Sequence, residues 1–87
     1  MEKRYSIQFA ESAARSLARL PAAVRVRVAT KIDALADNPY PAGTRKMKGV
    51  EHGYRLRVGD YRVVYDIFED VVVVLILRVG HRKDVYR

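Results

Sequence analysis

Three arginines lie close to a Gly59-Asp60 pair: Arg55 and Arg57 precede it and Arg62 follows it. A glycine-first pair between alternating residues is typical of a two-residue hairpin turn. Such a turn would place Arg57 directly opposite Arg62 on the neighbouring strand, with Arg55 on the same face. Guanidinium groups bind phosphate through two parallel hydrogen bonds and stay charged at physiological pH. Phosphate binding is therefore the chemistry that this spacing offers.

The predicted pairing of Arg57 with Arg62 brings like charges together, which destabilises a sheet. At about 5 Å the repulsion reaches about 0.8 kcal/mol in water and about 3 kcal/mol at an effective dielectric constant of 20. A site built for phosphate would explain why the sequence carries this repulsion. Alternatively, the arginines extend their charged ends into solvent from an exposed face. The residues alone leave both interpretations open.

The C-terminal segment carries a second group of polar residues, His81, Arg82 and Tyr86, directly after a predicted strand. Gly80 allows a sharp change of direction at this point, so the segment could fold back over the arginine face. Of the three side chains, only His81 has an ordinary pKa suited to proton transfer near neutral pH. Alternatively, Tyr86 packs against the body of the domain and its neighbours form an ordinary basic terminus.

The hydrophobic pattern predicts the elements that position these residues. Apolar residues alternate over 4–9, as in a strand, and recur at helical spacing over 12–20 and 24–35, with Pro21 between the two helices. The stretch 38–53 has no clear period and is predicted to be a loop that contacts a partner. Three antiparallel strands follow over 54–79, and the valine-rich last one is expected inside the sheet.

This order predicts an α+β fold, with the N-terminal strand and the two-helix hairpin packed on one face of a mainly antiparallel sheet. The hairpin register pairs Val58 with Tyr61 and so assigns the faces. The face toward the helices would hold Tyr54, Leu56, Val58, Tyr61, Val63, Tyr65 and Ile67. The opposite face would hold Arg55, Arg57, Arg62, Val64, Asp66 and Phe68.

The composition limits the kinds of site that the chain can build. Its 87 residues suit a single domain, 1–87, and carry 17 Lys and Arg against 10 Asp and Glu, a formal net charge of +7. This charge favours nucleic acid, an anionic membrane surface or an acidic protein as partner. Cysteine is absent and His52 and His81 lie far apart, so we expect no metal or other cofactor. The longest apolar run, 71–77, is shorter than the roughly 20 residues of a membrane span, and we expect a cytoplasmic protein without membrane contact.

Three segments together resemble the RelE/ParE superfamily of bacterial and archaeal type II toxins, and its RelE branch most of all. They are 46–49 (KMKG), 53–65 (GYRLRVGDYRVVY) and 79–86 (VGHRKDVY). The resemblance covers nearly the whole chain, including the order of strand, two helices and sheet. It implies a RelE-like microbial ribonuclease fold and a ribosome-dependent endoribonuclease that cuts mRNA in the ribosomal A site without a metal.

The resemblance also implies roles for individual residues. Arg62 and Arg82 match the family's arginines that hold and stabilise the scissile phosphate. Tyr86 matches its C-terminal catalytic tyrosine. Some relatives use a histidine close to the C-terminus, which makes His81 a candidate acid or base.

Two further groups of cations are expected to bind RNA. Arg55 and Arg57 fall where the best-known members of the family carry a lysine pair, and a guanidinium hardly deprotonates, so we expect these two residues to bind phosphate. The cluster in the predicted loop is expected to contact ribosomal RNA; its members are Arg45, Lys46 and Lys48.

The partners implied by the resemblance are mRNA, the ribosome and a cognate RelB-like antitoxin, with a toxin–antitoxin heterotetramer as one arrangement. Two alternatives stay open: a ParE-like inhibitor of DNA gyrase, and a basic RNA-binding module without catalysis. The combination of Arg62, Arg82 and Tyr86 favours the nuclease, because a gyrase inhibitor does not need it.

Overall fold

The computed structural model describes residues 4–49 and 53–85. Its elements are β1 (Ser6–Phe9), α1 (Glu11–Ala18), α2 (Ala22–Ala34), β2 (Thr44–Lys46), β3 (Gly53–Val58), β4 (Tyr61–Phe68), β5 (Val73–His81) and α3 (Arg82–Val85). The predicted strand, two helices and three C-terminal strands are all present, and β2 and α3 are additional. Over the described part of the chain, no helix is both long and apolar enough to cross a membrane.

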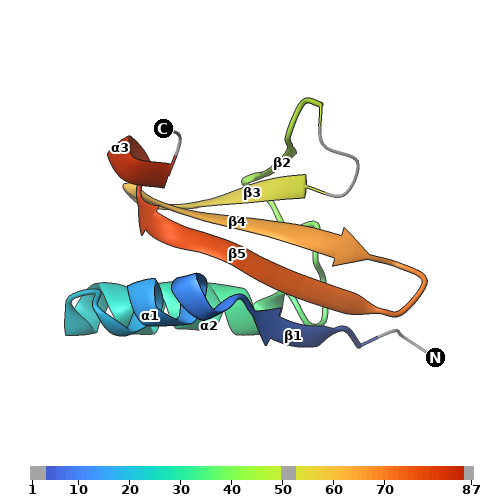
Figure 1. Cartoon of the computed structure of the whole chain (residues 1–87), viewed down its shortest axis with the longest axis horizontal. Coiled ribbons are helices and arrows are strands. Elements are labelled where there is room, and N and C mark those ends of the chain that lie inside the picture. Colours follow the sequence, from blue (N-terminus) through green and yellow to red (C-terminus); the bar gives the residue numbers. More distant parts are fainter. Residues whose placement is uncertain (1–3, 50–52, 86–87) are drawn as a thin grey trace.

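The strands form one sheet in the order β1-β5-β4-β3-β2. β1 runs parallel to β5, and the other neighbouring strands are antiparallel. Figure 1 shows α1 and α2 on one side of this sheet and the short α3 on the other side. The predicted α+β fold, with a two-helix hairpin on one face of a mainly antiparallel sheet, is therefore confirmed.

The β3–β4 hairpin has the predicted register. Val58 pairs with Tyr61, and Arg57 pairs with Arg62, on either side of a two-residue turn. Gly59 begins the turn with a φ of +59°, a conformation that glycine adopts without the steric cost of a side chain. The turn thereby determines which residues of the two strands share a face of the sheet.

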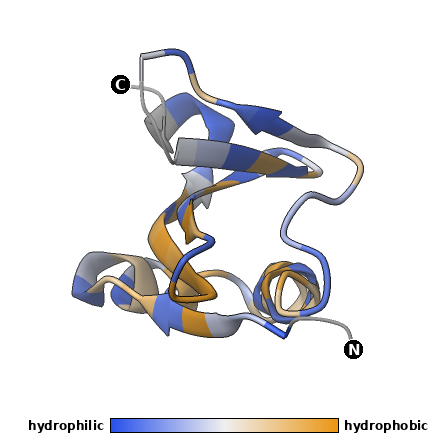
Figure 2. Cartoon of the chain, turned by 90° about the vertical axis from the view of Figure 1, so that its right-hand side faces the viewer, coloured by the Kyte–Doolittle hydropathy of each residue, from blue (hydrophilic) through white to orange (hydrophobic). Residues whose placement is uncertain are grey.

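The face toward the helices forms the hydrophobic core. The residues predicted for this face that are buried in the structure are Leu56, Val58, Val63, Tyr65 and Ile67. They pack with buried side chains of β5 and of the helices: Val74, Ile76, Val79, Ala13, Val28, Ile32 and Leu35. Figure 2 shows hydrophobic residues gathered in the middle of the sheet and on the helices. The opposite face, which α1 and α2 leave uncovered, is available for charged side chains.

The stretch predicted to be a loop contains a strand, so that prediction is wrong for residues 44–46. β2 pairs with β3 and places Thr44 opposite Leu56 and Arg45 opposite Arg55. The side chains of β2 are half-buried or exposed, so the strand shows no alternation of apolar residues. Pairing with β3 forms this edge strand, and a local sequence pattern does not report pairing with a distant segment.

β5 lies between β1 and β4, which confirms the interior position predicted for the valine-rich strand. It begins at Val73, because Val71 and Val72 belong to the turn after β4. The register of its pairing with β4 shifts by one residue. Arg78 lies opposite Val64, whereas Ile76 lies opposite Tyr65, the next residue of β4. Leu77 is therefore an extra residue, and β5 contains a β-bulge.

The bulge decides the direction of Arg78. Val74 and Ile76 are buried on the helix side, and strict alternation along β5 would place Arg78 beside them. An unpaired charge in a hydrophobic core is strongly unfavourable. Because of the extra residue, Val79 takes the buried position and Arg78 is exposed on the opposite face.

Candidate functional site

Arg57 and Arg62 lie side by side on the sheet face that α1 and α2 leave uncovered. Arg57 is exposed and Arg62 is half-buried. The Nη1 of Arg62 donates to the carbonyl oxygens of Gly59, at 3.2 Å, and Tyr61, at 3.1 Å. These two bonds orient the guanidinium beside the turn. A guanidinium forms a stronger hydrogen bond to an anion than to a neutral carbonyl oxygen.

β2 brings a fourth arginine to this face. Arg45 on β2 lies opposite Arg55 on β3. Arg57, two residues further along β3, lies opposite Arg62 on β4. The four arginines and Gly43 line a hollow of about 260 Å³. Arg55, Arg57 and Arg62, which the predicted hairpin register placed on one face, therefore lie together. The strand β2, which was not predicted, adds Arg45 to them. We call Arg45, Arg55, Arg57 and Arg62 the arginine cradle.

The basic cluster predicted from the sequence adjoins the arginine cradle. A second hollow of about 560 Å³ is lined by Arg45 and Arg55 together with Lys46, Met47 and Lys48. Positive charge therefore continues from the cradle along β2 and the residues that follow it. This arrangement extends the surface that a polyanion can contact.

The electrostatics of the arginine cradle favour an anionic ligand. Among residues 4–49 and 53–85, no carboxylate oxygen forms an ion pair with Arg45 or Arg57. Like charges on neighbouring strands raise the energy of the folded chain, and a bound anion offsets that repulsion. Guanidinium groups bind phosphate oxygens and stabilise added negative charge on them. The cradle can therefore bind phosphate and stabilise a reacting phosphoryl group.

His81 lies on the other face of the sheet. It pairs with Tyr61, a residue of the helix side, and the two rings meet edge to face with centroids 5.5 Å apart. Its Nδ1 accepts a hydrogen bond from the backbone N–H of Lys83 at 3.3 Å. The structure therefore does not bring this imidazole together with the arginine cradle.

Arg82 begins α3, which lies on the same side of the sheet as the arginine cradle (Figure 1). Its backbone N–H donates to the carbonyl oxygen of Asp60 at 2.9 Å, which fixes the start of α3 beside the β3–β4 turn. The Arg82 side chain is exposed. Tyr86, the predicted catalytic tyrosine, and His52 lie outside the described residues.

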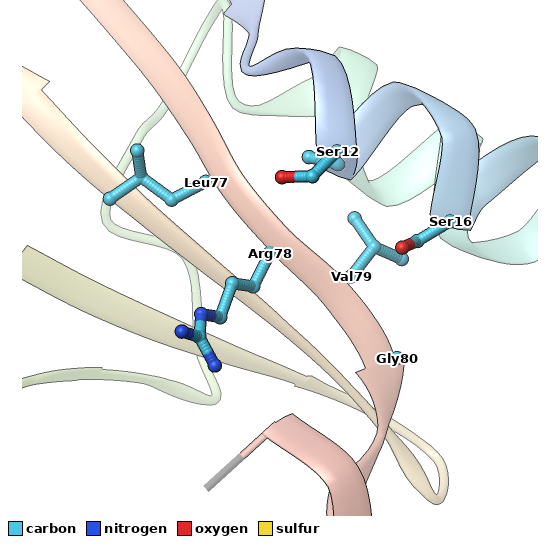
Figure 3. A pocket seen from close by; sticks show the side chains of 7 residues that line it. Ser12, Ser16, Leu77, Arg78, Val79 and Gly80 are labelled. Atoms are coloured by element: carbon cyan, nitrogen blue, oxygen red, sulfur yellow. The ribbon is translucent and has the colours of Figure 1, made fainter. Parts of the chain in front are cut away.

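Arg78 is a cation of this face that the sequence pattern does not identify. Figure 3 shows its side chain directed away from α1, whereas Ser12 and Ser16 of α1 face β5 from the other side. Unbroken alternation from Val74 and Ile76 would bury Arg78 among apolar residues, which is unfavourable for a charge. A charged residue at such a position indicates a bulge in the strand, and this signal could have identified Arg78.

The hollow drawn in Figure 3 lies between α1 and the end of β5 and has a volume of about 350 Å³. Its polar side chains are Ser12, Ser16 and Arg78, and the Arg78 side chain leads away from it. Within the described ranges, no three His, Asp or Glu side chains come together as a group that could hold a metal ion. The arginine cradle is therefore the stronger candidate for chemistry.

A buried hydroxyl holds the segment that leads into β2. Tyr65 is fully buried; its hydroxyl donates to the carbonyl oxygen of Pro39 at 2.9 Å and lies 3.0 Å from the hydroxyl of Thr44. Burial raises the pKa of Tyr65, so the phenol stays protonated and able to donate. Because Thr44 directly precedes Arg45, this contact helps to position the arginine cradle.

Glu69 ties the same segment to the β4–β5 turn. Its carboxylate accepts hydrogen bonds from the hydroxyls of Tyr40, at 2.6 Å, and Tyr5. Partial burial of the hydroxyl and its bond to Glu69 raise the pKa of Tyr40, and the bond to Glu69 raises the pKa of Tyr5. Both phenols therefore keep their protons far above neutral pH.

The fold and the site together define a small α+β protein that presents clustered arginines on the sheet face opposite its two main helices. Residues 7–86 match the family described as "ParE toxin of type II toxin-antitoxin system, parDE". The chain belongs to this family, and the predicted relationship to the RelE/ParE superfamily is confirmed.

Similar proteins place the chain near RelE within the superfamily. It is 32% identical over 84 residues to Toxin RelG of Mycobacterium tuberculosis, a match that covers 95% of this chain and 97% of the relative. It is 30% identical over 81 residues to the mRNA interferase toxin RelE of Escherichia coli, covering 91% of this chain and 84% of that protein. The solved archaeal RelE–RelB complex of Pyrococcus horikoshii contains a chain with a TM-score of 0.81 at 29% identity, covering 93% of this chain and 98% of that one.

Proposed function

We propose that this type II toxin is a ribosome-dependent endoribonuclease that cleaves mRNA in the A site. The arginine cradle carries the proposal, because four guanidinium groups around one hollow suit the phosphates of an RNA strand. The relatives named mRNA interferases support the reaction class. Inhibited translation and growth arrest follow from cleavage of the message.

The reaction is an attack of an RNA 2′-oxygen on the adjacent phosphorus. The bond from phosphorus to the 5′-oxygen breaks, which leaves a 2′,3′-cyclic phosphate on one product and a 5′-hydroxyl on the other. A base removes the proton of the 2′-hydroxyl, and an acid supplies a proton to the departing 5′-oxygen. Negative charge accumulates on the non-bridging oxygens of phosphorus, where guanidinium groups stabilise it.

Binding of the scissile phosphate and stabilisation of its developing charge fall to different arginines: Arg57, Arg62 and Arg82. The adjacent positions of Arg57 and Arg62 support a joint hold on the scissile phosphate. Arg82, at the start of α3, stabilises the developing charge from the C-terminal side, as the resemblance to the family implies. Removal of one donor from such a site commonly costs about 10²–10³ in rate.

Tyr86 is the proposed group for proton transfer at the 2′-hydroxyl, on the basis of its match to the family's catalytic tyrosine. Arg55 and Arg57 replace the lysine pair of the best-known members, and guanidinium groups hardly deprotonate. Arg55 and Arg57 therefore contribute charge rather than protons. His81 is not proposed for this step, because its imidazole packs against Tyr61 on the helix side of the sheet.

The proposed inhibitor is a RelB-like antitoxin. The Pyrococcus horikoshii relative was solved as a RelE–RelB complex, and the net charge of +7 on this chain suits an acidic or amphipathic segment. Such a segment would cover cations that otherwise contact RNA. A toxin–antitoxin heterotetramer is one assembly that this pairing allows.

Translation in a purified system tests the proposal. Toxin is added to translating ribosomes, and the ends of the mRNA are mapped by primer extension. We expect cuts at A-site codons with the wild-type chain and none with Arg82→Ala, which should still bind its antitoxin. Replacement of the 2′-hydroxyl at the cut site by hydrogen should also block cleavage, and a cut at that position would exclude the proposed attack.

A supercoiling assay with DNA gyrase, run in parallel, tests the second candidate function. The ParE description of the matching family favours gyrase inhibition as that candidate. Lost supercoiling together with intact mRNA would establish gyrase inhibition and reject the nuclease. A-site cuts with unaffected supercoiling would do the reverse.

A further inference from the structure

Arg78 shares the face of the arginine cradle but does not line its hollow. It lies opposite Val64 on β4; Val64 lies opposite Arg55 on β3, and Arg55 lies opposite Arg45 on β2. These four residues form one row across four neighbouring strands. Since neighbouring strands lie about 4.8 Å apart, Arg78 stands about 10 Å from Arg55.

The next row of the same face contains Gly80, Arg62 and Arg57. Arg78 and Arg62 are therefore diagonal neighbours across the β4–β5 pair, about 7–8 Å apart, a separation that long side chains can reach across. Gly80, directly opposite Arg62, contributes no side chain between them. Arg78 thus extends the positive face from the cradle toward β5.

The side chain of Arg78 is available to a ligand. It is exposed, and Figure 3 shows it extended away from α1 on the far side of β5. It forms no ion pair with any residue of the described ranges. A β-bulge, which interrupts the β4–β5 ladder, is what places this charge on the open face.

The charge on this face exceeds what one phosphate neutralises. A phosphodiester carries one negative charge and two non-bridging oxygens, which Arg57 and Arg62 are sufficient to engage. Arg45 and Arg78 lie on either side of this pair, and neither forms an ion pair within residues 4–49 and 53–85. Each can meet a further phosphate, and a single RNA strand supplies phosphates at regular intervals.

We propose that Arg78 binds the phosphate adjacent to the scissile one, so that the RNA strand crosses the sheet from β2 toward β5. This inference rests on the RNA-binding part of the proposed function. The scissile phosphate lies at Arg57 and Arg62, and the flanking phosphates lie at Arg78 on one side and at Arg45 and Arg55 on the other. The protein thus binds the RNA through at least three consecutive phosphates.

Binding of 2′-O-methyl RNA, which cannot be cleaved by its own 2′-oxygen, tests the proposal on the full-length chain. Fluorescence anisotropy with a ten-nucleotide single strand is measured over a series of salt concentrations. The proteins compared are the wild type, Arg78→Gln, Arg78→Lys and Lys31→Gln. Lys31 is the matched control, because it is an exposed cation on α2, which packs on the opposite face of the sheet.

Each phosphate contact to a single strand contributes about 0.7 to the slope of log K against log salt concentration. We expect Arg78→Gln to flatten this slope by about 0.7 and to weaken binding several-fold at low salt. Arg78→Lys should keep the slope and bind more weakly than the wild type, because lysine supplies charge without the two parallel hydrogen bonds. Lys31→Gln should match the wild type in both quantities.

A dinucleotide with a single phosphodiester separates the flanking site from the scissile one. Its weak binding is followed by NMR titration. The dinucleotide should occupy only the position between Arg57 and Arg62, so Arg78→Gln should bind it as the wild type does. Weaker binding of this probe by Arg78→Gln would show that Arg78 holds the scissile phosphate itself, which overturns the proposal.

Two other results would also overturn it. One is an unchanged salt slope in Arg78→Gln, or an equal change in Lys31→Gln. The other is unchanged RNA binding together with weakened antitoxin binding, which would assign Arg78 to the protein interface. Thermal unfolding of Arg78→Gln checks that the variant is folded. A chain that shows the expected slopes but cuts no mRNA would refute the nuclease proposal and leave the assignment of Arg78 intact.

Discussion

Replacement of Arg57 by glutamine should stabilise the folded protein and weaken its binding to RNA. Arg57 and Arg62 are cross-strand partners, and at about 5 Å their charges repel by about 0.8 kcal/mol in water. The exposure of Arg57 makes the value for water the appropriate one. Screening lowers it to about 0.5 kcal/mol at 0.1 M salt and about 0.2 kcal/mol at 1 M, where the Debye length falls from about 10 Å to about 3 Å.

Thermal unfolding of the Arg57→Gln variant at these two salt concentrations measures the effect. For a domain of this size, 1 kcal/mol corresponds to a change in Tm of about 4–8 °C. We therefore expect the variant to melt about 2–4 °C above the wild type at 0.1 M salt and about 1 °C above it at 1 M. Lys31→Gln is the control and should lower the Tm. Lys31 lies in the last turn of α2, where a cation stabilises the helix C-terminus.

Two results would refute this reasoning. A variant no more stable than the wild type at 0.1 M salt would show that the guanidinium groups diverge and do not repel. A gain in stability that persists at 1 M salt would have a cause other than charge. If Arg57→Gln binds a single-stranded RNA as tightly as the wild type, the arginine pair is not a phosphate site.

Three further outcomes concern groups outside this pair. His81→Gln should leave the pH dependence of single-turnover cleavage unchanged between about pH 5 and 8, and a changed pH profile in the variant would return His81 to the reaction. Because the fold raises the pKa of Tyr40, stability should be complete below the unfolded pKa of about 10 and should fall as the pH rises above it. Urea unfolding should show a flatter decline for Tyr40→Phe, and an identical decline would contradict the role of its bond to Glu69. Tyr65→Phe leaves the buried Pro39 carbonyl without its donor and should lower the free energy of unfolding by about 1–3 kcal/mol, whereas a loss below about 0.5 kcal/mol would show that the segment before β2 is held by other contacts.

The β3–β4 hairpin shows how far local sequence reasoning reaches. The pair Gly59-Asp60 predicts the turn, the turn sets the register, and the register places Arg57 opposite Arg62. Every step involves residues close together in the chain. The same holds for the helices, whose period of three to four residues correctly predicts the buried positions Val28 and Ile32.

Arg45 shows where that reasoning ends. It joins the arginine cradle only because β2 pairs with β3, and the three residues of β2 carry no hydrophobic alternation. The hydrogen bonds that form this edge strand come from a segment after it in the chain. A pattern read along one segment cannot report a partner strand elsewhere.

Arg78 and His81 show a second limit, which is set by the β-bulge in β5. Regular alternation after Val74 and Ile76 would bury Arg78, but one extra residue reverses the faces. Beyond the bulge, Arg78 and Gly80 share the face of the arginine cradle, and His81 shares the helix face with Tyr61. Pairing between β4 and β5 controls these directions.

By itself, the sequence determined the α+β class, the two helices, the hairpin register and the convergence of Arg55, Arg57 and Arg62, because turn geometry and periodicity act between neighbouring residues. Only the tertiary structure decided which further charges join them. Strand pairing adds Arg45, and the bulge adds Arg78, while the same strand turns His81 to the opposite face. The physical reason is that the energy of a charged side chain depends on the face that it occupies, and a distant strand selects that face.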